Sequence, residues 1–416
     1  MNKIRSKNAI IAICALVYFV SYFTRKDFAA AMAAMLEAEV IEKSIGGLIG
    51  TMLFIFYGVG QLVSGYLGDK IKPKYLIVFG LATTALCNLV MPLVPGGVMI
   101  AVWGLNGFAQ AMLWPPIVKI LSNYLNHEKF VTANLIVTSA AHVSTILLYI
   151  YVPICISFMS WETVFFTASA LAAVSIVAFV VSLAIIIPKD AEVLPASTRK
   201  AQNGGALCEP ISKIVFSTGL AFIFICIIMC GFLRDGIESW LPTLYSEAFN
   251  RDASESILVS GALPVFSIVS VTFVRAIHKS KLFNNEIRGA AILFLFSAIL
   301  CIPLAILIGK DNAAARIICL SLTVLVCAAM HGVNFLLISC VPGRFAVFGR
   351  SSTVSGLTNA FVYIGAAVST YGIALVSAHL GWSLTICTWI AVAFVGVIFA
   401  IPAYRKYTSF IYAENQ

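Results

Sequence analysis

Three residues near the N-terminus have types and a spacing that suit the binding of an anion. Tyr18, Tyr22 and Arg25 stand in an apolar run at positions i, i+4 and i+7, so a helix would place them on one face. An arginine inside a membrane costs at least roughly 3 kcal/mol, and such residues are functional candidates by default. Two phenols and a guanidinium facing a cavity would bind an anion. The alternatives are an arginine that reaches the interface from a helix end, or a structural ion pair with Asp27 or Glu37.

A second arginine, Arg234, lies deep in a later apolar run. Guanidinium groups bind phosphate or carboxylate through two parallel hydrogen bonds, which a lysine does less well. Gly236 and Pro242 would let a helix bend beside it. Glu238 follows one helical turn later and could neutralise Arg234, so a structural ion pair is the alternative to a binding role.

Other polar residues in the apolar runs are weaker candidates. His142 could bind a dianion, carry a proton or bond a neighbouring helix, and His331 gives a weaker signal still. Tyr363 could face a cavity or belong to the core. Cys226 and Cys230, like the other cysteines, have no metal-ligand spacing, so we expect buried free thiols, no metal and no cofactor. No nucleophile–base set or phosphate-binding loop is visible, which argues against an enzyme.

The composition indicates the elements that must position these residues. The chain of 416 residues is 61% hydrophobic and 11% charged, whereas soluble domains carry roughly 25% charged residues. Lipid admits only helices or closed barrels, and the long continuous apolar runs favour helices of about 20 residues. We predict an all-α membrane protein with twelve transmembrane helices near residues 8–30, 44–68, 75–94, 98–124, 131–155, 163–187, 213–246, 255–275, 289–309, 313–340, 352–378 and 384–404.

One long polar stretch, 188–210, divides these helices six and six. We therefore predict an N-terminal half (1–187), a cytoplasmic middle loop (188–212) and a C-terminal half (213–416). This layout is typical of transporters with a binding site between two repeated halves; an ordinary loop of a channel or receptor is the alternative.

The basic residues predict the orientation. Of the 27 lysines and arginines, 19 fall on one predicted side of the membrane and four on the other. The positive-inside rule then places both termini in the cytoplasm. It also explains most of the net charge of +9 without a nucleic-acid partner.

The segment 65–74 is expected to join the second and third helices. The segment resembles the loop signature of the major facilitator superfamily, a Gly-x-Leu-x-Asp-Arg-like turn followed by basic residues. The matching residues are Gly65, Asp69 and Lys70. Asp69 can anchor neighbouring helix ends, and the lysines favour the cytoplasmic side.

Across nearly its whole length the chain resembles the organophosphate:phosphate antiporter family of the major facilitator superfamily. The resemblance rests, in chain order, on Tyr18-x3-Tyr22-x2-Arg25-Lys26-x-Phe28-Ala-x-Ala-Met32, Tyr57-Gly58, Asn106-Gly107-x2-Gln110-x3-Trp114-Pro115-Pro116, Ala141-His142, Arg234-x-Gly-Ile-x2-Trp240-x-Pro242-Thr243 and Gly356 to Gly365. It implies two phosphate-binding arginines and a lining of histidine and tyrosines, which here are Arg25, Arg234, His142, Tyr18, Tyr22, Tyr57 and Tyr363. It also implies rocker-switch exchange of a phosphoester for inorganic phosphate.

Two departures from the family bear on the substrate. Gln61 occupies a position where the family commonly has a lysine, and Asp235 and Glu238 add negative charge beside Arg234. A monoanionic phosphoester, a carboxylate or a sulfonate is then an alternative substrate, with proton coupling through Glu238, Asp235 or His142.

We therefore expect a monomeric transporter of an organic anion in the inner or plasma membrane. The partners we expect are the organic anion, inorganic phosphate and the lipid bilayer. A proton-coupled symporter of an organic anion is the first alternative. A sugar-phosphate sensor that does not transport is the second, because the family contains such a sensor.

Overall fold

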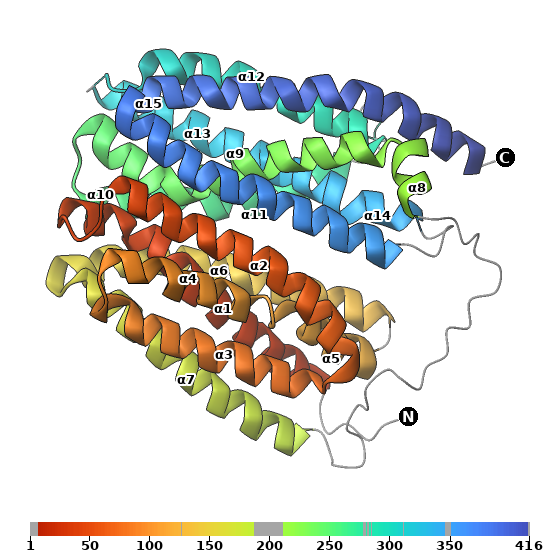
Figure 1. Ribbon diagram of the computed structural model, residues 1–416, viewed down its shortest axis with the longest axis horizontal. Helices are drawn as coiled ribbons and strands as arrows, with labels where there is room; N and C mark the ends of the chain where they lie inside the picture. The colour runs from red at the N-terminus through yellow and green to blue at the C-terminus, as the bar shows by residue number, and fades with distance from the viewer. Residues whose placement is uncertain are drawn as a thin grey trace. The chain divides into compact units, whose positions relative to one another are not determined.

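The computed structural model describes residues 7–125, 127–186, 211–277, 280, 283, 285–310, 312–345 and 351–414, and every regular element in them is a helix (Figure 1). The α-helices are α1 Lys7–Glu37, α2 Lys43–Lys70, α3 Pro73–Val90, α4 Gly96–Gln110, α5 Trp114–Tyr124, α6 His127–Phe158, α7 Trp161–Ile186, α8 Ile211–Ser217, α9 Leu220–Phe249, α10 Ala253–Ser260, α11 Ala262–Ile277, α12 Glu286–Leu307, α13 Ala313–Asn334, α14 Val341–Arg344 and α15 Ser351–Glu414. A 3₁₀ turn, η1, covers Met91–Leu93, and a π-helix, η4, covers Phe335–Cys340.

Within these ranges, eleven segments are long and apolar enough to cross a membrane. The last, Val354–Phe410, lies in α15, which consists of two helices joined at Gly381, where φ is 78° and ψ is 174°. Large apolar side chains remain exposed on the outer faces, as on α7, where Val174 and Val177 are 67% and 63% exposed. Surfaces of this kind suit a lipid environment. The predicted all-α membrane fold is confirmed.

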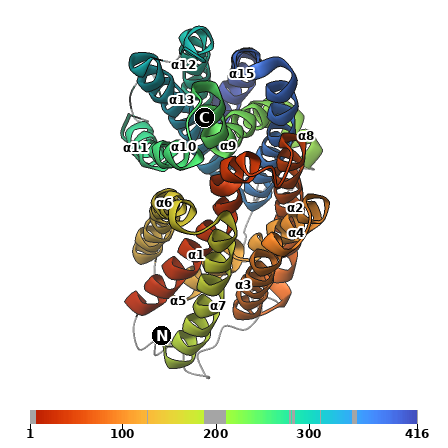
Figure 2. The same cartoon turned by 90° about the vertical axis from the view of Figure 1, so that its left-hand side faces the viewer.

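The chain forms two compact units. The first unit comprises 1–45, 52–201 and 253–264, and the second comprises 46–51, 202–252 and 265–416. In the first unit α1 packs between α6 and α7, and α3 packs on α4 and α7 (Figure 2). In the second unit α15 packs on α9 and α12, and α13 on α9 and α12.

The predicted division into two six-helix halves stays a prediction. Its middle loop, 188–212, lies outside the described residues except for Ile211 and Ser212. These two residues begin α8, so this helix starts at residue 211, two residues before the predicted start at 213.

Several predicted helices are interrupted where the backbone chemistry requires it. The helix expected over 98–124 ends at Gln110 and restarts at Trp114, because Pro115 and Pro116 donate no backbone hydrogen bond and favour a helix start. The helix expected from 213 is divided into α8 and α9 at Gly219, whose φ of 80° is readily accessible to glycine. The one expected over 255–275 is divided into α10 and α11 at Gly261.

The segment between the second and third helices is a correction to the predicted loop. Residues 65–70 continue α2, whose end is marked by the Ile71 amide donating to the Leu67 carbonyl at 2.8 Å. Pro73 then starts α3, so the connection is two residues long. The side chains of Asp69 and Lys70, and the surroundings of Gly65, lie outside what the structure describes.

The last part of the tenth predicted helix, 313–340, departs from α-helical geometry. After Asn334 the chain forms η4 and then α14, which carries Arg344. The Arg344 Nη2 atom lies 3.2 Å from Oε1 of the buried Glu286 at the start of α12. This ion pair holds the end of α14 against α12.

Candidate functional site

In the first unit, α1 brings the predicted N-terminal cluster together. The Arg25 guanidinium carbon lies 4.2 Å from the ring centroid of Tyr22 and 5.0 Å from that of Tyr57 on α2. The rings of Tyr22 and Tyr18 meet edge to face at 5.1 Å, and Tyr18 also lies 4.7 Å from Trp114 of α5. Arg25 is therefore a half-buried cation supported by aromatic faces, an arrangement worth about 0.5–2 kcal/mol.

The two carboxylates considered as partners of Arg25 have other contacts. Asp27 is fully buried, and its Oδ1 accepts a hydrogen bond from the Phe28 amide at 2.8 Å. Glu37 accepts from the Ala253 amide at 3.3 Å, which ties the end of α1 to α10.

A buried hydrogen-bond network that the sequence did not reveal fastens α1 beside Arg25. The Thr24 carbonyl accepts from Asn88 of α3 at 3.3 Å and from Asn106 of α4 at 3.1 Å. Gln110 donates to the Thr24 hydroxyl at 2.9 Å and accepts from Ser21. Leaving one such group unpaired would cost about 1–3 kcal/mol, so the network fixes the turn of α1 that carries Arg25.

In the second unit, α9 holds Arg234 by polar contacts. Its Nη2 lies 2.7 Å from Asp235 Oδ2, and its Nε donates to Asp235 Oδ1 at 3.2 Å. Its Nη1 donates to the Asn334 side chain of α13. Arg234 is 12% exposed, so this is a largely buried guanidinium whose charge is compensated by the adjacent residue.

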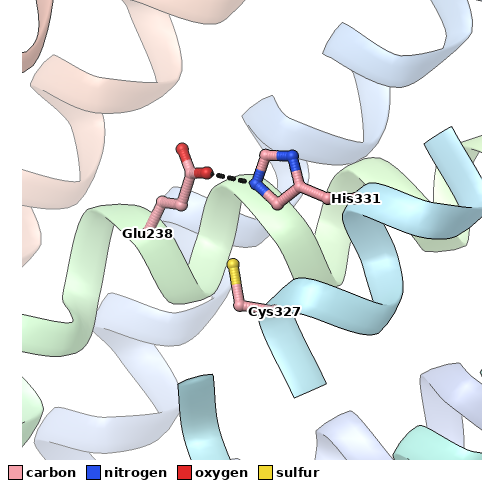
Figure 3. Close-up of side chains that lie close together, drawn as sticks. All are labelled: Glu238, Cys327 and His331. Carbon is pink, nitrogen blue, oxygen red and sulfur yellow. Dashed lines mark hydrogen bonds and ion pairs between the residues drawn. The ribbon is translucent and has the colours of Figure 1, made fainter. Parts of the chain in front are cut away.

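Glu238, the partner expected from the i, i+4 spacing, forms an ion pair with a different residue. Its Oε1 lies 2.7 Å from His331 Nε2 on α13 (Figure 3). Cys327 completes a cluster in which the Glu238 oxygen, the thiol sulfur and an imidazole nitrogen all lie within 4.8 Å of one another. Such a set has the donor types of a metal site.

The arginine helix of the second unit is packed tightly against α15. A Cβ atom at Gly231 would overlap the Val362 carbonyl oxygen, and one at Gly365 would overlap the Ile228 carbonyl oxygen. The close helix contact expected from the small residues of 356–365 is thus present at Gly365, whereas a Cβ at Gly356 would meet no atom within 4 Å.

The remaining candidates are placed as follows. His142 on α6 and Gln61 on α2 are half-buried residues of the first unit, and Tyr363 on α15 is a half-buried residue of the second. The first unit brings Tyr18, Tyr22 and Tyr57 to Arg25 or to each other. The second brings Asp235 to Arg234 and places Glu238 one turn later on the same helix. The functional role of each of these residues stays a prediction.

The family of the chain follows from its sequence together with this fold. A family model described as "Major Facilitator Superfamily" matches residues 14–370. The chain belongs to the Major Facilitator Superfamily, and its eleven apolar spans within the described ranges make it a multi-pass membrane protein. Two solved structures share the fold: a bacterial homolog of the human lysosomal transporter Spinster (TM-score 0.74, 11% identity, 97% of this chain and 98% of that chain) and the nucleoside transporter NupG (TM-score 0.72, 14% identity, 96% and 99%). At these identities they show the fold alone.

Curated relatives narrow the family. The chain is 24% identical over 387 residues to the glycerol-3-phosphate transporter of Bacillus subtilis, covering 88% of this chain and 84% of that protein. It is 36% identical over 108 residues to the probable hexose phosphate transport protein of Chlamydia pneumoniae, covering 26% and 24%, and 33% identical over 113 residues to the membrane sensor protein UhpC of Escherichia coli, covering 27% and 26%. The matches to the Chlamydia proteins span about a quarter to a third of their lengths. The resemblance to the organophosphate:phosphate antiporter family is confirmed, since these relatives are members of it.

Proposed function

We propose that this chain is a secondary transporter that exchanges an organophosphate for inorganic phosphate across a plasma membrane. The observation that carries the proposal is the half-buried Arg25, held over the rings of Tyr22 and Tyr57 inside a membrane-spanning helix. A guanidinium stays charged in such surroundings, and its planar fork matches a phosphate. The relatives that transport glycerol-3-phosphate or hexose phosphate support a substrate of this class.

Arg25 and Arg234 would each contribute to anion binding, but with different surroundings. Arg25 would supply a cation held over aromatic faces, and Arg234 a cation already matched by Asp235. The positive charge that Arg234 offers to a substrate is then smaller than that of a bare arginine. We therefore infer a preference for a phosphoester in its singly charged form, or for a related monoanion.

Exchange would follow from alternating access. A phosphate group that stabilises the closed intermediate more than the open states lowers the barrier for both directions, and this couples entry of one anion to exit of another. With both termini in the cytoplasm, as the basic residues predict, a monomer would suffice for this cycle.

A proton-coupled symporter of an organic anion is the second candidate. The observation that favours it is the ion pair of Glu238 and His331, one turn along α9 from Arg234 and 13–17% exposed. An imidazole and a carboxylate within hydrogen-bond distance can hold a proton between them, which is the chemistry that proton coupling requires.

The experiment that separates these candidates is phosphate efflux from proteoliposomes. Liposomes containing the purified chain are loaded with radiolabelled phosphate, and the initial rate of release is measured with and without an external phosphoester. Acceleration by the phosphoester, unaffected by collapsing the pH gradient, is the expected result. If phosphate neither leaves nor competes, and uptake of the organic anion instead follows an imposed pH gradient, the symporter replaces the exchanger. Binding without flux in either assay would indicate a sensor.

A further inference from the structure

Three side chains from two helices of the second unit converge beside Arg234. Cys327 and His331 are four residues apart on α13, so they lie on one face of that helix. Glu238 comes from the facing helix α9, 93 residues from His331 along the chain (Figure 3). One carboxylate oxygen, one thiol sulfur and one imidazole nitrogen lie within 4.8 Å of one another.

The chemistry of this donor set points to one class of ligand. Calcium and magnesium select oxygen atoms alone, whereas a mixed set of sulfur, nitrogen and oxygen is the pattern of Zn²⁺ and similar divalent cations. Such ions bind the three atoms at roughly 2.0–2.3 Å, which places the ligand atoms of a tetrahedron about 3.3–3.7 Å apart. Atoms within 4.8 Å of one another can therefore reach an ion by side-chain adjustment, and the 2.7 Å contact between Glu238 and His331 would lengthen by about 0.6–1.0 Å.

The site is reachable yet sheltered. Glu238 and His331 are 17% and 13% exposed, so an ion can arrive through them, while Cys327 is buried. The ligand types favour borderline metals over the abundant hard cations. Three protein ligands leave a fourth position for water or for a small anion.

We propose that Glu238, Cys327 and His331 form a three-ligand binding site for a single Zn²⁺-type divalent cation, joining α9 to α13. No sequence pattern indicated this site, because neither a Cys-x3-His pair nor a distant glutamate is a metal signature by itself. The site lies one turn from Arg234 and its partner Asn334, so a bound cation would fix the same pair of helices that holds the guanidinium.

The test uses Co²⁺ as a spectroscopic probe on the purified, tag-free full chain in detergent. Bound to a thiolate in a tetrahedral site, Co²⁺ gives an intense near-ultraviolet charge-transfer band and strong visible bands. We expect saturation at one equivalent of Co²⁺ and displacement of Co²⁺ by Zn²⁺. Cys327→Ser should abolish the charge-transfer band, and His331→Ala should weaken Co²⁺ binding by more than the 10–100-fold typical of losing an outer-shell partner.

Cys319→Ser is the matched control, because Cys319 is a buried free thiol on the same helix outside the cluster. It should leave the band and the stoichiometry unchanged. Absence of the band in the unaltered chain, or its persistence in Cys327→Ser, would overturn the proposal and leave Glu238 and His331 as an ion pair. Size-exclusion profiles of each variant establish that it is folded. The readout needs no transport, so a failed exchange assay would leave this result standing.

Discussion

The surroundings of Arg25 and of Arg234 show two ways of keeping a guanidinium inside a membrane protein. Arg25 lies over the faces of Tyr22 and Tyr57, which stabilise its charge through their quadrupoles without cancelling it. Arg234 is held by the carboxylate of Asp235 and the amide of Asn334. Carboxylate contacts are stronger than cation–π contacts and also compensate charge, so Asp235 should reduce the attraction that Arg234 leaves for an anion.

The helices that carry these arginines are also fixed differently. A buried polar network centred on Thr24 and Gln110 ties α1 to α3 and α4. In the other unit, α9 is fixed by backbone contact with α15 at Gly231 and Gly365. The contact of α9 with α15 thus depends on shape as well as on polar contacts, so bulky substitutions at Gly231 or Gly365 should disturb it.

The largest expected effect comes from replacing either arginine by lysine. Arg25→Lys and Arg234→Lys should each lower phosphoester-driven phosphate efflux by about 100-fold or more, because losing a charge-assisted bidentate contact costs about 3 kcal/mol. Arg405→Lys, at an exposed position of α15, is the matched control and should transport normally. Normal efflux in either of the first two variants, at equal protein in the liposomes, would end the proposed role of that arginine.

Removing the carboxylate beside Arg234 should strengthen the attraction of this arginine for an anion. Asp235→Asn leaves the guanidinium uncompensated by its neighbour, so we expect the affinity for doubly charged over singly charged phosphoesters to rise about tenfold. The ratio of their inhibition constants for phosphate efflux measures this. Asp252→Asn, at an exposed position beyond α9, should leave the ratio unchanged. An unaltered ratio in Asp235→Asn would mean that Arg234 does not sense the substrate's charge.

The aromatic support of Arg25 can be tested separately from its charge. Tyr22→Leu should weaken phosphate binding about fivefold, in line with about 1 kcal/mol for a cation–π contact, whereas Tyr22→Phe keeps the ring and should retain affinity. Binding by isothermal titration calorimetry makes the comparison. Equal losses in both variants would assign the effect to the phenol hydroxyl.

The smallest effect is expected at Gln61, a half-buried residue of α2 one turn beyond Tyr57. Gln61→Lys should strengthen binding of doubly charged phosphoesters about two- to threefold relative to singly charged ones, because partly exposed charges are screened. The same inhibition ratio is the readout. If it does not move, Gln61 does not face the anion.

The helices were predictable because an apolar run of membrane length admits almost no other structure. The interruptions of these helices were less predictable. Pro115 and Pro116 belong to a motif in the sequence, yet the three-residue turn between α4 and α5 was not expected. Gly381 joins two helices through a single residue where a short loop was expected.

The arginines themselves were found from the cost of a charge in lipid, but their partners were only partly foreseen. Spacing favoured Glu238 as the partner of Arg234, whereas the adjacent Asp235 supplies the carboxylate and Glu238 contacts His331. Asn334 lies 100 residues away along the chain, and nothing in a single sequence relates such positions. Long-range polar contacts depend on the packing of helices, which periodicity does not encode.

The π-helix η4 has a consequence for insertions and deletions in this chain. Each residue of an α-helix turns the chain by about 100°, and a π-helical stretch holds one residue more than the regular ladder would. Deleting one residue from Phe335–Cys340 would restore regular hydrogen bonding, but it would swing Arg344 away from Glu286 or Asn334 away from Arg234. The π-helix therefore sets the rotation of the chain between Asn334 and Arg344. Only with its extra residue can Asn334 reach Arg234 while Arg344 reaches Glu286.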